Sequence, residues 1–395
     1  MKINIGGPLI GAAFLMATSA IGPGFLTQTT VYTQKLGAAF GFAILVSVVL
    51  DIVVQLNVWR VISIAGRPAQ SVSNLVFPGL GHVLTLLIVF GGLAFNIGNI
   101  AGAGLALQVI FGWDVLTGTI LSCLFAIGVF LVREATVTMD RITRSLGFIM
   151  IALTVYVAWQ SKPPLSIALR ESFFPGRVDF TAILTIVGGT VGGYITFAGA
   201  HRLLDAGVTG AAAMPRVNRS AITAISLASF MRVLLFLGAL GVVMSGATLD
   251  ASNPAASVFS IAAGEAGYKL FGIVLWAAAI TSVIGSAYTS VSFIPGFGGS
   301  GTTPRRRWTT VIFICISTLV FAVIGQPVKV LILAGTLNGL VLPISLTIML
   351  IAAHRLSIVG SYHHPRWLAV AGVLVILAMM YMGIRTIMSL IQPVA

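Results

Sequence analysis

The chain consists mainly of long apolar runs, separated by short stretches that contain charged residues, proline or glycine. An α-helix needs about 20 apolar residues to cross a bilayer. Runs of that length indicate eleven membrane spans, at residues 7–33, 39–62, 80–110, 113–132, 143–160, 180–206, 219–245, 267–293, 308–325, 328–353 and 367–391. The two longest gaps, 161–179 and 246–266, are predicted to be loops with short surface helices.

Composition supports this interpretation of the pattern. Hydrophobic residues make up 58% of the chain and charged residues 8%, whereas a soluble domain has roughly 45–50% and 25%. Soluble enzymes, disordered chains and nucleic-acid-binding domains are therefore excluded. We predict an all-α polytopic membrane protein, embedded in the lipid bilayer, in which residues 1–395 form a single transmembrane domain.

The formal net charge of +13 follows the membrane topology. If the N-terminus is cytoplasmic, fourteen Lys and Arg residues fall in cytoplasmic loops or span ends and six on the other side. Short cytoplasmic loops carry such an excess of positive charge. The charge therefore indicates orientation and not a nucleic-acid partner, and the odd number of spans places the C-terminus outside.

Two spans contain residues that interrupt a helix. The first has Gly22-Pro23-Gly24 in its middle, and the sixth contains GGTVGGYITFAGAHRLLDAG at 188–207. Proline removes a helix hydrogen bond and glycine allows unwinding, although glycines in membrane helices also serve close packing. Breaks at corresponding positions of two five-helix halves are typical of inverted-repeat transporters, with the substrate between them. The halves would span about 7–160 and 180–353, with an extra helix at 367–391.

These features together resemble the NRAMP family of divalent-metal transporters, which shares the inverted-repeat fold of the amino-acid transporter LeuT. The resemblance rests on the Pro-Gly break, on LGAAFGFAIL in span two, on AGAHRLLDAG after the second break, and on GTLNGLVLPISLTIML in span ten. GPLIGAAFLMATSAIGPGFLTQ, LAFNIGNIAGAGL and GGYITFAGAHRLLDAG are similar to a bacterial NRAMP-like subgroup often encoded near 5-oxoprolinase subunits. The resemblance implies a multi-pass protein of the bacterial inner (plasma) membrane.

The metal-binding motifs of the family are missing from this chain. The family binds metal with an Asp-Pro-Gly-Asn motif at the first break and a methionine of a Met-Pro-His motif at the second. Here the first break has Gly22 and Phe25 in place of the aspartate and the asparagine, and residues 197–201 contain neither methionine nor proline. No Asp or Glu occurs in residues 1–50. We therefore predict no metal site of the family's kind.

The groups that remain at the breaks favour an anion. A half-helix that begins near Phe25 would point free N–H groups and its positive dipole end at the cavity. We predict a small anion as substrate, such as a carboxylate like 5-oxoproline, or bicarbonate. The predicted substrate-binding residues are Gly22, Pro23, Gly24, Phe25, Thr27, Gln28, Asn96, Asn99, Tyr194, Thr196, Gly199 and Asn338. Asn96, Asn99 and Asn338 either face the substrate or hydrogen-bond between helices. Ser286 of span eight is a further candidate for the lining of the site.

Ionisable residues at membrane depth are candidates for ion coupling. Asp51, near the centre of span two, either binds a coupling proton or cation or pairs structurally with Arg232 of span seven. His201, Arg202 and Asp205 follow the second break and either relay protons or form a salt-linked helix end. No nucleotide-binding loop is present, so the driving force is predicted to be a proton or Na⁺ gradient.

No motif indicates an enzyme or a cofactor. The Gly-x-Gly pairs lie within spans and do not follow a strand, so the dinucleotide-binding pattern lacks its context. We predict an ion-coupled secondary transporter. One alternative is a divalent cation transporter for Mg²⁺ or Mn²⁺ that has rebuilt its site from backbone carbonyls and His201. Another is a channel or a non-transporting sensor.

Overall fold

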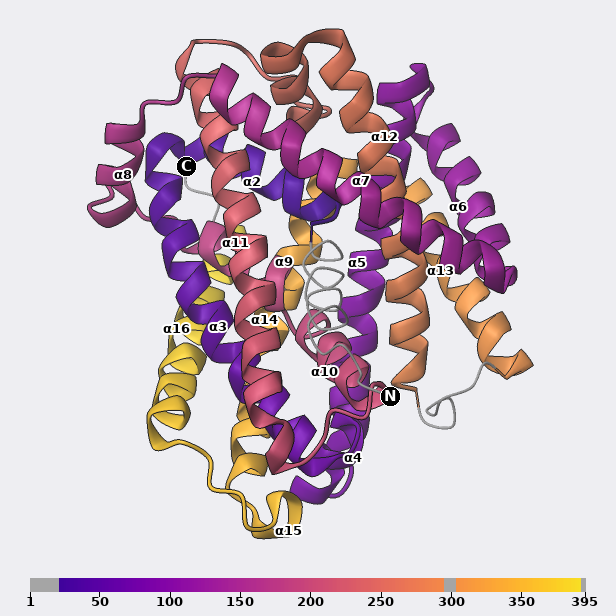
Figure 1. Cartoon of the computed structure of the whole chain (residues 1–395), viewed down its shortest axis with the longest axis vertical. Helices are drawn as coiled ribbons and strands as arrows, with labels where there is room; N and C mark the ends of the chain where they lie inside the picture. The colour runs from indigo at the N-terminus through magenta and orange to yellow at the C-terminus, as the bar shows by residue number, and fades with distance from the viewer. Residues whose placement is uncertain (1–20, 295–302, 392–395) are drawn as a thin grey trace, which may run out of the picture.

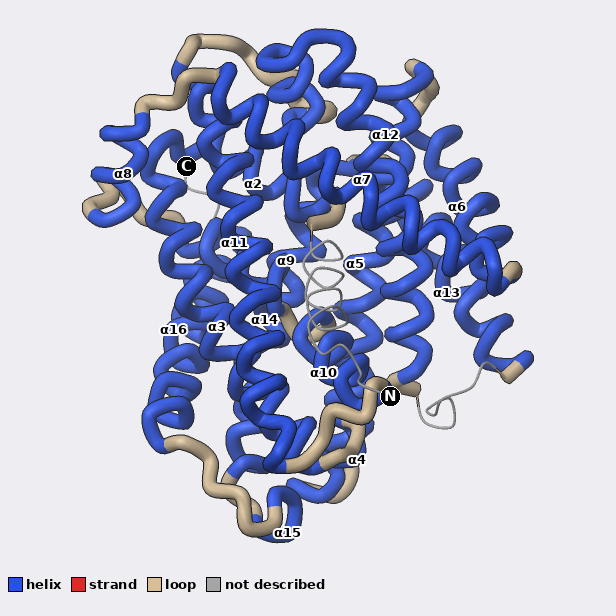
Figure 2. Tube along the Cα trace, in the orientation of Figure 1, coloured by secondary structure: helices blue, strands red, loops and turns tan. Residues whose placement is uncertain are grey.

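The computed structural model describes residues 21–294 and 303–391. These residues form helices joined by turns and loops, with no strand among them (Figure 1, Figure 2). The helices are α2 (Pro23–Leu36), α3 (Phe40–Ala65), α4 (Ala69–Val76), α5 (Leu80–Phe111), α6 (Val115–Leu131), α7 (Arg133–Gln160), α8 (Leu165–Phe173), α9 (Phe180–Val191), α10 (Ile195–Asp205), α11 (Met214–Met244), α12 (Pro254–Ser292), α13 (Pro304–Ile324), α14 (Pro327–Ala353), α15 (Leu356–Val359) and α16 (Arg366–Ile391), with 3₁₀ turns η1 (Gly37–Ala39) and η2 (Ala211–Ala213).

Each predicted span corresponds to helical structure. Residues 7–20 of the first span lie outside the described residues, and α2 forms its remainder. In the described part of the chain, 8 helical stretches are long and apolar enough to cross a membrane, and the first of them contains both α2 and α3. Val115–Leu131 and Ser145–Gln160 are shorter apolar helices at the fourth and fifth predicted spans. The prediction of an all-helical polytopic protein is confirmed.

Each of the two long gaps between spans contains a short helical segment. The gap at 161–179 contains α8, as predicted for a short surface helix. The gap at 246–266 also contains a short helical segment, the first part of α12, which begins at Pro254, where the Asn253 side chain accepts a hydrogen bond from the Ala256 N–H. Gly264, with φ 65° and ψ −167°, bends α12 between its surface part and the predicted span. Such a positive φ is readily available only to glycine.

The helices divide into a buried centre and an apolar outside. The helices differ in the share of residues that are buried in their most apolar part. This share is 83% for the stretch that contains α9 and α10 and 72% for α14, but only 33% for α13 and 33% for α16. The outer helices expose large apolar side chains such as Leu319, Val323 and Leu377. A bilayer is the solvent in which such an exterior is stable. The predicted broken span therefore lies at the centre of the bundle.

The first break lies where α2 begins. Gly22 is extended there, with φ −98° and ψ −174°, and Pro23 occupies the first helical position. Proline is well suited to this position because its missing N–H would have no acceptor within the helix. At Gly102 of α5 a side chain would collide with the ring of Pro23. The glycine therefore lets α5 approach closely and hold the start of α2.

The second break comprises residues 192–194, between α9 and α10. Asn338 of α14 bonds to the broken segment twice. Its side-chain Oδ1 accepts from the Tyr194 N–H at 3.2 Å, and its backbone carbonyl accepts from the Gly193 N–H at 3.2 Å. The break is thus a defined structure in which a neighbouring helix replaces the missing helical hydrogen bonds.

The glycines of span six could either allow the helix to unwind or allow close packing of helices, and those of α9 and α14 show close packing. A Cβ on Gly188 of α9 would collide with the backbone of Gly335 and Gly339 on α14. A Cβ on Gly339 would in turn lie 2.5 Å from the carbonyl oxygen of Leu184. The α9 and α14 backbones are therefore in direct contact immediately before the second break.

Candidate functional site

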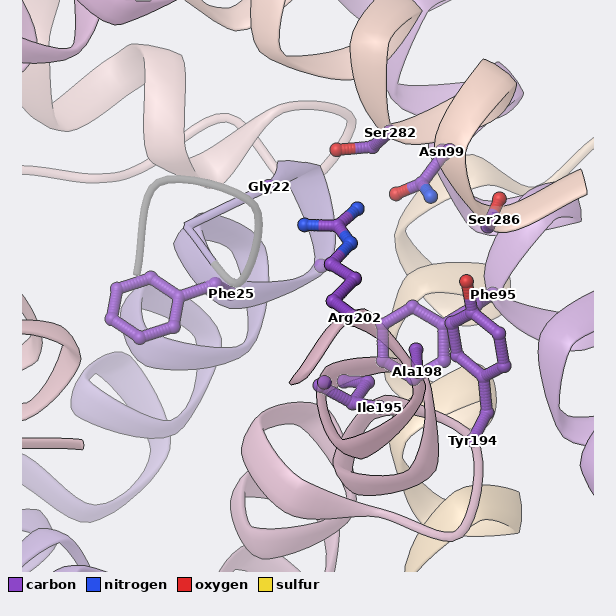
Figure 3. Close-up of a pocket in the computed structure, with 13 residues that line it drawn as sticks. Gly22, Phe25, Phe95, Asn99, Tyr194, Ile195, Ala198, Arg202, Ser282 and Ser286 are labelled. Atoms are coloured by element: carbon purple, nitrogen blue, oxygen red, sulfur yellow. The ribbon is translucent and has the colours of Figure 1, made fainter. Parts of the chain in front are cut away.

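A pocket lies between the two breaks. Its volume of about 80 Å³ holds several waters or a small solute, since one water needs roughly 10–15 Å³. The start of α2, one side of α5, one side of α10 and the middle of α12 form its walls (Figure 3). It is lined by Gly22, Gly24, Phe25, Phe95, Asn99, Tyr194, Ile195, Ala198, Gly199, Arg202, Ser282, Gly285 and Ser286.

The N-terminal end of α2 faces this pocket. The first amides of any helix have no acceptor within the helix, and the helix dipole adds partial positive charge. In α2 the bond from the Leu26 N–H to the Gly22 carbonyl begins the helical ladder. Gly24 and Phe25, which precede Leu26, both line the pocket. This end of α2 therefore favours a negatively charged group.

The start of α10 contributes in a different way. Its first amides are already bonded, because Asn338 accepts from Gly193 and Tyr194, and the Gly192 carbonyl accepts from Ile195 at 2.9 Å. This half-helix therefore offers side chains to the pocket.

Arg202 supplies a full positive charge from α10. It is an exposed residue that lines the pocket, and one of its Nη atoms would lie 3.8 Å from a Cβ on Gly285 of α12. Figure 3 shows its guanidinium between the start of α2 and the side chains of Asn99 and Ser282. The described lining residues include no Asp, Glu or His. Arg202 therefore sets the sign of the charge in the pocket.

Neutral polar groups stand opposite the start of α2. A Cβ on Gly22 would be 3.6 Å from both Asn99 Oδ1 and Ser282 Oγ. Ser286 lies one turn after Ser282, and its hydroxyl donates to Asn96 Oδ1 at 2.7 Å. The Asn99 amide and the Ser282 hydroxyl can donate hydrogen bonds to a small solute without adding charge, whereas the Ser286 hydroxyl, whose proton is donated to Asn96, can only accept.

Aromatic rings form the apolar part of the wall. The rings of Phe95 and Tyr194 are 6.2 Å apart between centroids, with 37° between their planes, whereas the ring of Phe25, a lining residue of α2, points away from them (Figure 3). Apolar walls lower the local dielectric constant, which strengthens the interaction of Arg202 with a bound charge.

Several predicted site residues lie outside the pocket lining. Asn96 donates to Ser317 Oγ at 2.9 Å, so it joins α5, α12 and α13. Asn338 holds the second break, and Gln28 donates to the Leu331 carbonyl at 2.8 Å. The helix-joining alternative therefore describes Asn96 and Asn338. The predicted residues that are buried outside the lining are Pro23, Thr27, Gln28, Asn96, Thr196 and Asn338.

The group predicted as a relay is divided in the structure. Arg202 lines the pocket, whereas His201 points away from it: its Nε2 accepts from the Ala69 N–H at 3.0 Å, and its ring stacks on Phe293 at 4.1 Å. Asp205, at the end of α10, is exposed. His201 is thus placed to hold α4 against α10.

Asp51 and Arg232 are both buried near the centre of the bundle, but no ion pair joins them within 4.0 Å. The direct pairing considered for them is therefore not formed. Arg232 instead donates to Thr190 Oγ1 at 3.0 Å, and its guanidinium carbon lies 4.3 Å from the centre of the Phe25 ring.

Sequence reasoning did not select five of the lining residues: Phe95, Ile195, Ala198, Ser282 and Gly285. Ser282 and Gly285 stand with Ser286 in the run SVIGS of span eight. Two serines at i and i+4 share one face of a helix, and this spacing was a signal that could have identified the α12 wall.

Comparison with known proteins identifies the family. Residues 13–389 match the family model of natural resistance-associated macrophage protein-like (Nramp) proteins. The chain belongs to the Nramp family. It is a transporter-like membrane protein of this family and not an enzyme.

Two bacterial relatives share more than half of their residues with this Nramp protein. The uncharacterized membrane protein YcsG of Bacillus subtilis is 55% identical over 379 residues, which cover 96% of this chain and 94% of the relative. An uncharacterized membrane protein of Haemophilus influenzae is 54% identical over 384 residues, which cover 97% of this chain and 96% of the relative. The chain is therefore a multi-pass membrane protein with bacterial relatives.

Solved structures support the predicted fold. A mutant of the manganese transporter of Eremococcus coleocola superposes with a TM-score of 0.71 at 18% identity, covering 99% of this chain and 89% of that one. MhsT in complex with L-phenylalanine gives 0.65 at 18% identity, with coverage of 95% and 98%. At such low identity the likeness concerns the fold alone, and it confirms the LeuT-like architecture.

Proposed function

We propose that this Nramp protein is a secondary active transporter of a small anion. The observation that carries the proposal is Arg202, whose guanidinium shares the pocket with the N-terminal end of α2 and with neutral hydrogen-bonding side chains. A carboxylate or bicarbonate ion would meet positive charge from both. The cavity of about 80 Å³ suits an anion with few heavy atoms, such as bicarbonate or a compact carboxylate of the 5-oxoproline kind.

A divalent cation fits this pocket less well. Hard cations such as Mg²⁺ and Mn²⁺ are held by carboxylates and other oxygen ligands, and here they would face the charge of Arg202. His201, the imidazole on which a rebuilt site would depend, is bonded to Ala69 outside the lining. The manganese transporter of E. coleocola shares the fold of this chain at 18% identity, which does not extend its substrate to this protein.

The proposal includes an ion gradient, preferably of protons, as the driving force. In this fold type, transport proceeds by rocking of one helical group against another around a fixed site between the breaks. We place the protein in a bacterial inner membrane with a cytoplasmic N-terminus, as the distribution of Lys and Arg indicates.

Uptake into proteoliposomes tests the substrate class. Labelled 5-oxoproline and labelled bicarbonate are offered separately, with Mn²⁺ and Mg²⁺ uptake measured in parallel. We expect saturable uptake of at least one anion that responds to an imposed proton gradient. Metal uptake that is unaffected by these anions would overturn the proposal, and flux that neither saturates nor follows the gradient would indicate a channel.

Variants of Arg202 test the site itself. A charge-assisted hydrogen bond contributes about 1.5–3 kcal/mol, so Arg202→Gln should weaken anion binding roughly 10–150-fold, at about 1.4 kcal/mol per tenfold. Arg202→Lys keeps the charge and should retain part of the affinity. Arg216→Gln, at an exposed position of α11, is the matched control. Equal affinity in wild type and Arg202→Gln would exclude Arg202 from the anion site.

A further inference from the structure

Two charged side chains are buried near the bundle centre without a direct partner of opposite charge. Asp51 of α3 is 1% exposed and Arg232 of α11 is 2% exposed. Asp51 Oδ1, and Arg232 Nε and one Nη, have no hydrogen-bond partner. A buried charge is costly unless it is paired and hydrogen-bonded, and ionisable groups at membrane depth are functional candidates for that reason.

Arg232 connects Asp51 to both breaks. Its guanidinium lies over the ring of Phe25, which lines the pocket in the first turn of α2. The same guanidinium donates to Thr190 Oγ1 in the last turn of α9, immediately before the second break. Asp51 lies on α3, which packs against the α11 helix of Arg232, and the two buried charges are close enough to interact although no ion pair within 4.0 Å joins them. A change of charge at Asp51 therefore acts on a side chain that contacts both half-helices.

The other ionisable groups near α3 are engaged elsewhere or exposed. Among the charges of the described residues, the one that acts on Asp51 is that of Arg232. On the helices packed against α3, Lys35 pairs with Asp179, Glu171 accepts from the Gly176 N–H, and Tyr32 donates to Thr185 Oγ1 at 3.1 Å. His201 and Arg202 are described above. The remaining groups are exposed: Arg170, Asp205, Arg216, Arg219, Lys329, His354, Arg355, Arg366, Tyr381 and Arg385.

We propose that Asp51 binds the coupling proton and that Arg232 transmits the charge of Asp51 to the anion pocket through its contacts with Phe25 and Thr190. This inference rests on the proposed anion transport. It identifies the coupling residue of that function, the residue that transmits its state, and the direction of coupling.

The direction of coupling follows from counting charges. With Asp51 ionised, its negative charge offsets that of Arg232, and the anion is attracted by Arg202 and the N-terminal end of α2. When Asp51 takes up a proton, the charge of Arg232 is no longer offset, and the region around the pocket becomes more positive by one unit. The anion then binds more tightly, and by linkage a bound anion raises the proton affinity of Asp51. Proton and anion therefore move in the same direction.

Infrared difference spectroscopy of the purified protein tests the proton site without any substrate. A protonated carboxyl group has a C=O band that the carboxylate lacks. We expect a pH-dependent band in wild type that is absent from Asp51→Asn and unchanged in Glu265→Gln, a control at an exposed acid. In Arg232→Gln the band should persist to higher pH, because the charge that stabilises the carboxylate is gone. The inference is overturned if wild type and Asp51→Asn give the same spectra.

Isothermal titration with 5-oxoproline or bicarbonate tests the coupling. Titrations in two buffers of different ionisation enthalpy report whether a proton is taken up as the anion binds. We expect proton uptake in wild type, none in Asp51→Asn, and anion affinity that increases ~5–150-fold as Asp51 becomes protonated, the usual range of coupling between two sites. Anion binding without proton uptake would overturn the inference and leave the proposed anion site intact. If neither anion binds while the Asp51 band is present, the proposed substrate class fails and the proton site stands.

Discussion

Asn338 accepts the Tyr194 N–H through its side-chain Oδ1 at 3.2 Å, and the same side chain donates to the carbonyls of Gly91 and Ala334 at 3.0 Å each. One amide of α14 therefore bonds to α5, to its own helix and to the second break. This arrangement explains how a broken helix can be stable in a protein interior, where an unpaired amide is costly.

Replacing this amide should destabilise the protein. Asn338→Ala leaves the Tyr194 N–H without its acceptor, and an unsatisfied buried group costs about 1–3 kcal/mol. We expect the melting temperature to fall by several degrees in a thermal-shift assay. Asn74→Ala is the control, because exposed Asn74 also accepts one backbone N–H, from Gly81 at 2.8 Å, and water can replace it. Similar losses in both variants would contradict the role given to Asn338.

The contact between α9 and α14 predicts a strong effect of a single methyl group. In Gly188→Ala the new Cβ meets the backbone of Gly335 and Gly339, which cannot rotate away. Overpacking usually costs about 1–3 kcal/mol, so the variant should unfold at a lower temperature or be recovered in low yield. Gly128→Ala on α6 is the matched control, because nothing lies within 4 Å of its added Cβ. Equal stability of the two variants would refute this packing.

A carboxylate placed at the first break should cancel the preference of the pocket for an anion. Gly22 has room for a side chain, since its Cβ would make ordinary contacts of 3.6 Å and its φ of −98° is open to all residues. Gly22→Asp puts a negative charge near Arg202 and should weaken anion binding at least ~10-fold through like-charge repulsion. Gly22→Asn has the same size without the charge and should bind normally. Loss of binding in both variants would point to steric blocking instead.

His364, in the loop before α16, should make stability depend on pH. Its Nε2–H donates to Asn57 Oδ1 at 2.8 Å, and its Nδ1 has no partner. Burial, with the nearby Arg60 and His354, lowers the pKa of His364 from 6.5 to about 4. The unfolded chain therefore binds this proton more readily, so stability is complete above about pH 6.5 and is lost as the pH falls toward 4.

The measurement for His364 is the melting temperature at pH 7.5 and at pH 5. The wild type should lose stability on the order of 1–3 kcal/mol more than His364→Gln over this range, because one pKa unit is worth about 1.36 kcal/mol. His82→Gln, at an exposed histidine, should behave as wild type. A wild type and a His364→Gln variant with the same pH response would exclude this assignment.

The spans and the breaks could be predicted because the bilayer imposes simple requirements. Length and apolarity define a span. Pro23 has no N–H group and cannot donate a helical hydrogen bond, so it favours a break or a helix start. The start of α12 could not be located in this way. Its first turns lie outside the apolar run, and Gly264 joins them to the span by a bend that only the folded backbone reveals.

The lining of the pocket was predicted in part, for a reason that lies in helix rotation. Gly22, Gly24, Phe25, Asn99, Tyr194 and Gly199 line the pocket as expected. Asn96 and Asn99 are about 60° apart around α5 at 3.6 residues per turn, which is enough to direct one toward Ser317 and the other into the pocket. Spacing shows which residues share a face, but the neighbour that this face meets is decided by tertiary packing.

The backbone contact between α9 and α14 also limits how the protein can change shape. Helices separated by side chains can slide, because the side chains adopt new rotamers. Gly188, Gly335 and Gly339 leave no such layer between the two backbones, so any shear there would force main-chain atoms past one another. In the proposed alternating access α9 and α14 would therefore travel as one rigid body, and the sliding surfaces of that cycle would lie on other faces of this pair.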